Sequence, residues 1–258
     1  MTKNNTSVAE EPVVSHRRKT ALLFGLPLWV LAGFILSQLA VATVVELLQV
    51  TGFSFESVNG STLNAVVAAV VYTLTIVIVI GVPLLWRKIR TTREELGLSR
   101  LPDWFDIFLA PASFVVYMLL AGALLAAVTG LFPGFDAEEV QDVGFEDLSH
   151  SYEYALAFIT LVIIAPVAEE VLLRGYLYGK LRKVSSLVTA MLISSLLFSV
   201  MHFQWNVALN VLPLGIVLVV LREMTGSIWA GILLHMLKNG VAFYLLFVNP
   251  TLMNTIGG

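Results

Sequence analysis

Long apolar runs are the feature that most constrains this chain. Runs of about 20 residues or more, long enough to cross about 30 Å of hydrocarbon, recur along nearly the whole sequence. The sequence is 58% hydrophobic and only 13% charged, with a mean hydropathy of +0.87, far above ordinary soluble domains. This composition excludes a soluble globule. It predicts an all-α fold, a polytopic integral membrane helix bundle of about seven transmembrane helices.

The apolar runs also predict how the chain is organised. The expected crossings lie near residues 21–50, 62–86, 106–132, 152–183, 186–203, 207–221 and 227–248. The first run is too long for a signal-peptide core and lacks a clear cleavage site, so we expect an uncleaved first helix. The expected segments are an N-terminal tail, N-terminal helices with their loops, a polar membrane core and a C-terminal tail, at residues 1–20, 21–150, 151–248 and 249–258.

The positions of the basic residues predict the orientation. Of fifteen Lys and Arg residues, four precede residue 20, five lie in 87–105, three lie in 180–183 and one is Arg222. The loop 51–61 has no Lys or Arg, and the loop 133–151 is acidic. Because cytoplasmic loops carry an excess of Lys and Arg, we expect a multi-pass protein of the plasma membrane with a cytoplasmic N-terminus.

The remaining polar residues of the apolar runs gather in the C-terminal half. A charged side chain at the centre of a bilayer costs about 2.5–3.5 kcal/mol on insertion scales, so each needs a physical reason. The residues are Glu169, Glu170, Arg174, His202, His235, Lys238 and Asn239. Counted at about 1.5 Å per residue from the cytoplasmic ends, Glu169, His202, His235 and Asn239 reach similar depths on three helices.

Some of these residues also have plain structural explanations. Glu170 and Arg174 stand at i,i+4, so they are expected to neutralise each other. An isolated His202 would be an interhelical hydrogen-bonding residue, but its depth matches that of Glu169. For Lys238 we expect either an acidic partner or extension into a polar cavity, without a catalytic role.

At these positions the sequence resembles the CAAX-prenyl-protease and bacteriocin-processing family of intramembrane proteases, also called the Abi family. The family signature is E-E-x-x-x-R, then F-x-x-x-H, then H-x-x-x-N or D, on successive membrane helices. Here the motifs appear in that order within about residues 152–243, as Glu169-Glu170 with Arg174, Phe198 with His202, and His235 with Asn239. Residues 93–98 show a softer likeness. Signatures of other intramembrane proteases, such as H-E-x-x-H, G-x-G-D and G-x-S-G, are absent from the sequence.

The resemblance makes residues 151–248 the expected catalytic core of an intramembrane endopeptidase. Amide hydrolysis needs an activated water, a stabilised oxyanion and a proton for the leaving amine. Glu169 is the expected base, with His202 holding the water. His235 and Asn239 are expected to donate to the oxyanion, in line with the family's roles. Glu170, Arg174 and Phe198 are expected to support the helices that carry them.

Three matters of function remain open at the level of sequence. No cofactor is expected, but the alternative of zinc held by Glu169, His202 and His235 uses the same atoms. The expected partners are a membrane-associated peptide or protein substrate and the lipid bilayer, with no nucleic acid. The alternative functions are a non-enzymatic transporter and an immunity or binding protein that uses the same polar cluster.

Overall fold

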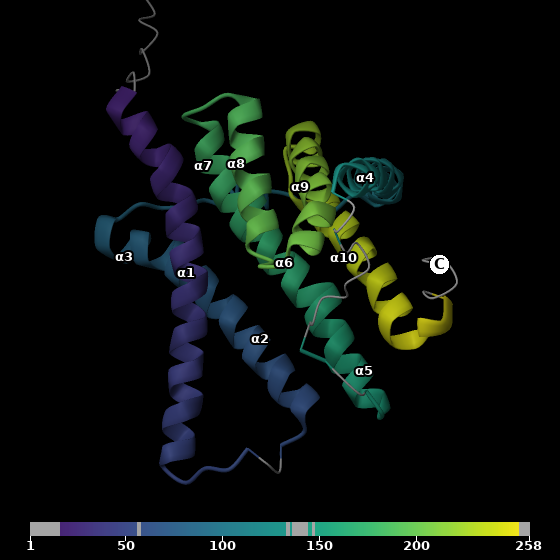
Figure 1. The fold of residues 1–258 in the computed structure, drawn as a ribbon. Helices are drawn as coiled ribbons and strands as arrows, with labels where there is room; N and C mark the ends of the chain where they lie inside the picture. Colours follow the sequence, from purple (N-terminus) through teal and green to yellow (C-terminus); the bar gives the residue numbers. More distant parts are fainter. Residues whose placement is uncertain (1–15, 56–57, 133–134, 136–143, 146–147, 253–258) are drawn as a thin grey trace, which may run out of the picture.

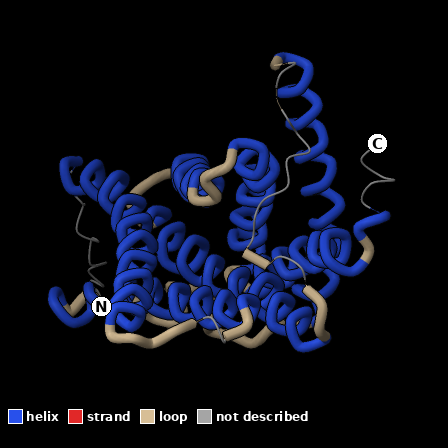
Figure 2. Tube along the Cα trace, turned by 60° about the horizontal axis from the view of Figure 1, so that its bottom comes forward, coloured by secondary structure: helices blue, strands red, loops and turns tan. Residues whose placement is uncertain are grey.

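The computed structural model describes residues 16–55, 58–132, 135, 144–145 and 148–252 of the chain. Within these residues the chain folds into helices joined by short loops, without a strand (Figure 2). Most of the expected acidic loop 133–151, the first fifteen residues of the N-terminal tail, and residues 253–258 of the C-terminal tail lie outside this description. The all-α membrane bundle predicted from the sequence is confirmed.

Among the residues that the structure describes, six helices are long and apolar enough to cross a membrane. Some of them contain π-helical segments, so one span can include several consecutive elements. The first three spans are α1 (His16–Val50), α2 with α3 (Gly60–Ile76, π-helical Val77–Gly81, Val82–Arg87) and α4 (Trp104–Leu131). The fourth is built from α5 (Ser151–Phe158), π-helical Ile159–Ile164, α6 (Ala165–Glu170), π-helical Val171–Tyr178 and α7 (Gly179–Arg182). The last two are α9 (Trp205–Thr225) and α10 (Trp229–Phe243) with π-helical Tyr244–Val248.

The predicted crossing near 186–203 forms a shorter helix than the others. It is α8 (Leu187–Val200), whose 14 residues extend about 21 Å, less than the hydrocarbon thickness of about 30 Å. The chain turns at residues 201–204 and continues as α9, which packs along α8. This turn therefore lies within the bundle, and it carries His202.

The helices of the C-terminal half lie side by side around the long helix α5–α7 (Figure 1). The interior is formed largely by α6, the π-helical segment after it, α8, α9 and α10, which supply most of the buried apolar residues. By contrast, α4 is seen almost end-on in Figure 1, and one of its ends projects beyond the other helices in Figure 2. It contacts chiefly α9 and α10, and its other faces are apolar and exposed.

The loop between α3 and α4 ties the long helix to α10. The backbone carbonyl of Gly97 accepts hydrogen bonds from Ser227 Oγ at 2.9 Å and from the Ile228 N–H at 3.2 Å. A Cβ on Gly175 or Gly179 would lie 3.1 Å from the Leu96 carbonyl oxygen or 2.9 Å from that of Glu95. Glycine at these two positions thus lets the loop lie directly on the helix.

Charged side chains strengthen the same loop. Glu95 forms an ion pair with Lys183, and this partner lowers the pKa of the Glu95 carboxyl below its ordinary value of 4.5. The Trp229 indole donates to the Arg100 carbonyl at 2.7 Å. The softer family likeness at residues 93–98 therefore corresponds to a loop that fixes the ends of two helices of the core.

Candidate active site

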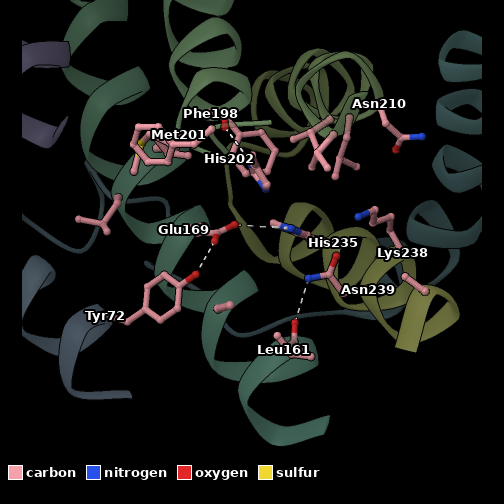
Figure 3. Close-up of a pocket in the computed structure, with 18 of the residues that line it drawn as sticks. Tyr72, Leu161, Glu169, Phe198, Met201, His202, Asn210, His235, Lys238 and Asn239 are labelled. Carbon is pink, nitrogen blue, oxygen red and sulfur yellow. Dashed lines mark hydrogen bonds and ion pairs between the residues drawn. The ribbon is translucent and has the colours of Figure 1, made fainter. Parts of the chain in front are cut away.

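The predicted site residues line one cavity inside the bundle. The cavity has a volume of about 520 Å³ and includes Glu169, His202, His235 and Asn239 in its wall (Figure 3). These residues come from α6, the turn after α8, and α10. The wall is completed by apolar side chains of α1, α9 and the helix 151–182. The structure thus brings together four residues that are up to 70 positions apart in the sequence.

The Glu169 carboxylate is held from two sides. One oxygen accepts a hydrogen bond from the Tyr72 hydroxyl of α2 at 2.7 Å, and the other lies 3.7 Å from His235 Nε2. The side chain is 18% exposed, so it is in contact with the cavity but largely withdrawn from the surface. A carboxylate with one fixed partner and one face toward a cavity can still accept a proton from a molecule bound there.

The neighbouring Glu170 points the other way and is fully buried. It accepts from Arg174 at 2.8 Å and lies 3.3 Å from His235 Nδ1. Arg174 is also fully buried, donates to the Gly215 carbonyl at 3.3 Å, and stacks 4.4 Å above the Phe198 ring. A buried arginine with a carboxylate, a carbonyl and an aromatic face is well compensated for its loss of water.

Phe198 and Glu170 together orient the two imidazoles. The Phe198 ring meets His202 and His235 edge-on, with centroids 5.1 and 5.5 Å away. His202 Nδ1 lies 2.8 Å from the Phe198 carbonyl oxygen. Because a carbonyl only accepts, this contact assigns the Nδ1 proton to His202 and leaves its Nε2 available to the cavity.

The backbone next to His202 is unusual. Phe203 has a φ of 56°, in the left-handed region that non-glycine residues rarely adopt. Its N–H donates to the Val200 carbonyl at 3.0 Å, which closes the turn after α8. The turn places the His202 ring inside the bundle although α8 ends two residues earlier.

Asn239 is positioned by an irregularity in the facing helix. In the π-helical segment Ile159–Ile164 the N–H of Ala165 donates to the Thr160 carbonyl, five residues back. The next residue, Pro166, has no N–H, so the Leu161 carbonyl loses its partner at this spacing. Asn239 Nδ2 donates to that carbonyl at 2.9 Å. The second N–H of the amide remains for the cavity.

Two residues of the cavity wall were not assigned roles by sequence reasoning. Tyr72 was missed altogether, and its only signal was a hydroxyl within an apolar run, where a partner is needed. Lys238 was expected to pair with an acid or extend into a cavity, and the structure places it in the cavity wall. Among the residues that the structure describes, no group of three or more His, Cys, Asp and Glu side chains is arranged to hold a metal ion.

Comparisons with known proteins find similarity in the region of the chain that contains these residues. Residues 151–241 match the family model "Type II CAAX prenyl endopeptidase Rce1-like", and this range contains all three motifs. A protein of Bacillus subtilis (strain 168) named "Putative membrane peptidase YdiL" is 27% identical over 150 residues. The match covers 57% of this chain and 56% of the relative, so the chain spans about half the length of that curated protein. No solved structure matches. Over residues 151–241, the chain is thus similar to the CAAX-protease and Abi family of membrane proteins.

Proposed function

We propose that the chain is an intramembrane endopeptidase of the glutamate type, acting on a membrane-associated peptide or protein. The observation that carries the proposal is that the Glu169 carboxylate faces a cavity shared with His202, His235 and Asn239. The family match supports the reaction class, since its description is that of an endopeptidase. The geometry supports the assignment of roles, as follows.

Water activation falls to Glu169 and His202. Glu169 takes the proton of the attacking water, and the free Nε2 of His202 accepts the second hydrogen bond of that water. Tyr72 holds one carboxylate oxygen in place, so the other is directed at the cavity. After attack, Glu169 passes the same proton to the leaving amine.

Stabilisation of the oxyanion falls to His235 and Asn239. For this role both ring nitrogens of His235 carry a proton: Nδ1–H donates to Glu170, and Nε2–H, which points toward Glu169 and the cavity, donates to the oxyanion. Asn239 offers its second amide N–H. These two side chains lie at i,i+4 on α10, so their donors approach a bound carbonyl from one side.

The proposed reaction uses protein groups alone, without a metal. Glu170, Arg174 and Phe198 take no part in the chemistry and hold the helices that carry the reacting groups. The cavity wall contains many apolar side chains, which suits a peptide that is itself held in or at the bilayer.

The proposal is tested by cleavage in a defined membrane. The purified chain is reconstituted in liposomes with a library of apolar peptides, and products are identified by mass spectrometry. Wild type should cleave a subset of peptides, and Glu169→Gln should reduce cleavage to background, because an amide cannot accept the proton. Glu46→Gln is the matched control, since Glu46 is an exposed glutamate in another apolar run.

The same liposomes distinguish the proposal from the transport alternative. If wild type cleaves no peptide but carries a proton current that Glu169→Gln abolishes, the polar cluster serves passage across the membrane and the protease assignment is wrong. Cleavage that survives in Glu169→Gln would remove Glu169 from its role while leaving the protease class intact.

We also propose that the N-terminus is cytoplasmic and that the chain resides in the plasma membrane. The support is the placement of basic residues on the loops 87–105 and 180–183. The sequence contains no cysteine, so single cysteines report cleanly. In intact cells, an impermeant thiol reagent should label a cysteine at Ser54 and spare one at Thr92; the opposite pattern would reverse the orientation.

A further inference from the structure

Lys238 is a cation in the cavity that the proposed reaction does not use. It lies in the wall, half-buried, with its amine directed into the cavity from the α10 side (Figure 3). Within the described part of the chain, no carboxylate lies within 4.0 Å of the Lys238 amine, and the amine makes no hydrogen bond. An ammonium inside an apolar bundle is unfavourable without a counter-charge. The Lys238 ammonium therefore indicates an anionic group that belongs to a molecule bound in the cavity.

Few charged residues line the cavity that Lys238 faces. Among the described residues of the cavity wall, Glu169 is the only acid and Lys238 the only Lys or Arg. Glu169, His202 and Lys238 all line the same cavity, so the three face the same space. The Glu169 carboxylate already has Tyr72 and His235 beside it, so Lys238 is not needed as its partner.

The position of Lys238 on α10 separates it from the reacting groups. His235, Lys238, Asn239 and Ala242 follow at i, i+3, i+4 and i+7, and all line the cavity. Asn239 is turned toward Leu161, whereas Lys238 lies on the side of Asn210 of α9 (Figure 3). Asn210 is exposed and accepts from the Tyr117 hydroxyl of α4 at 2.5 Å. The cation therefore occupies the end of the cavity next to α9 and α4.

We propose that Lys238 is a substrate-binding residue that takes a carboxylate of the peptide, either its C-terminal carboxylate or that of an acidic side chain. The proposal rests on the proposed peptidase function and names the class of substrate that suits this cavity. The peptide lies with its reacting carbonyl between Glu169 and Asn239, and its anionic group reaches the α9 end. The remaining wall is apolar and accepts the apolar side chains of the same peptide.

The test measures peptide binding rather than turnover. The protein carries Glu169→Gln, so that the probe is not cut, and is held in nanodiscs of neutral phosphatidylcholine, so that no anionic lipid competes. The probe is a leucine-rich peptide labelled at its N-terminus, prepared with a free C-terminal carboxylate or a carboxamide. A second pair is a carboxamide with one internal Glu or Gln. Dissociation constants come from fluorescence anisotropy.

At least one carboxylate form should bind about ten- to a hundredfold tighter than its neutral match, as expected for a hydrogen bond to a charged group. The pair that shows the difference identifies the source of the carboxylate. Lys238→Met should abolish the difference, and Lys238→Arg should retain it, because arginine stays protonated. Lys180→Met, which removes a cation beside Glu95, is the matched control and should retain it.

Equal binding of charged and neutral peptides by the Glu169→Gln protein that retains Lys238 would overturn the proposal. The same holds if the preference persists in Lys238→Met while the thermal unfolding of that variant matches its parent. This result is independent of the cleavage screen. Cleavage without a carboxylate preference refutes the role of Lys238 alone, and a preference without cleavage by wild type refutes the peptidase function but keeps the binding site.

Discussion

Both halves of this molecule consist of strongly apolar helices, but they differ in how they are packed. In the first three spans, only 17%, 22% and 11% of the most apolar 18-residue stretch is buried inside the protein. In the spans Ser151–Arg182, Trp205–Thr225 and Trp229–Val248 the shares are 50%, 44% and 28%. Apolar surface left exposed by a membrane helix contacts lipid, so the N-terminal half is chiefly a lipid-facing layer around the second half.

The difference shows where polar groups can be kept in a membrane. The buried ion pair of Glu170 with Arg174 and the imidazoles of His202 and His235 all lie in the half with the denser packing. There a buried polar group can find partners on neighbouring helices, as Arg174 does at the Gly215 carbonyl. The N-terminal half contributes to the cavity wall through Tyr72 and through Val30, Phe34 and Gln38 of α1. Its loop with Glu95 fixes the ends of helices of the second half. The predictions below test this division.

The largest effect on folding is expected at Arg174. Its change to alanine leaves Glu170 buried without its cation, which costs about 3–5 kcal/mol. Folded protein, measured by size-exclusion chromatography and thermal unfolding, should fall sharply. The control is Arg182→Ala on the same helix, which breaks an exposed pair with Glu223 and should cost less than about 1 kcal/mol. Equal losses in the two variants would remove the distinction between interior and surface.

Asn239 should separate activity from folding. Asn239→Ala removes an oxyanion donor and is expected to lower kcat by about 10²–10³-fold. It also leaves the Leu161 carbonyl without its donor, which costs about 1 kcal/mol of stability. Turnover and unfolding of the same preparation check both numbers. A loss of folded protein as large as in Arg174→Ala would show that Asn239 is a structural residue.

Tyr72 measures how much the lipid-facing half gives to the chemistry. Tyr72→Phe keeps the ring and removes the donor to Glu169, so kcat should fall about tenfold with little change in KM. The control is Tyr244→Phe, which alters an exposed hydroxyl. If KM rises and kcat is unchanged, Tyr72 binds substrate and does not position the base.

The smallest effect is expected in the loop that joins the halves. The pKa of Glu95 is lowered chiefly by Lys183, so its ionised form stabilises the folded state above the ordinary value of 4.5. That stability is lost as the pH falls through the lowered pKa. The contribution of this partly exposed group should stay under about 1 kcal/mol. Thermal unfolding of wild type should therefore lose more stability than that of Glu95→Gln between neutral pH and a pH below 4.5; parallel curves would contradict this role.

Much of this fold could be predicted, because a helix that crosses a membrane must be long and apolar. The expected crossing 186–203 is a 14-residue helix, since the turn that carries His202 begins inside the bundle. Sequence hydropathy does not report such a turn, because apolar Met201 and Phe203 flank His202 there. The helix boundaries elsewhere follow the predicted runs closely.

The sequence predicted that Glu169, His202, His235 and Asn239 lie close together, but it missed Tyr72 and did not predict the contacts of these residues. The depths of Glu169, His202 and His235 follow from counting along each helix, and the structure lines one cavity with them. The hydrogen bond from Tyr72 to Glu169 joins residues 97 positions apart. It depends on how α2 packs against the helix that carries Glu169, which hydropathy does not predict. The contact of Asn239 with Leu161 depends on a π-helical turn before Pro166, whose spacing no motif encodes.

The central claim is that the Glu169 carboxylate, acting without a metal, activates the water that cuts the peptide. The most direct measurement is the cleavage rate of one peptide by the purified chain before and after exhaustive chelation, with its metal content determined in parallel. We expect an unchanged rate after chelation, no stoichiometric metal, and background rates for Glu169→Gln with an unaltered unfolding temperature. About one zinc per chain, lost with activity on chelation and in His202→Ala and restored by added zinc, would contradict it.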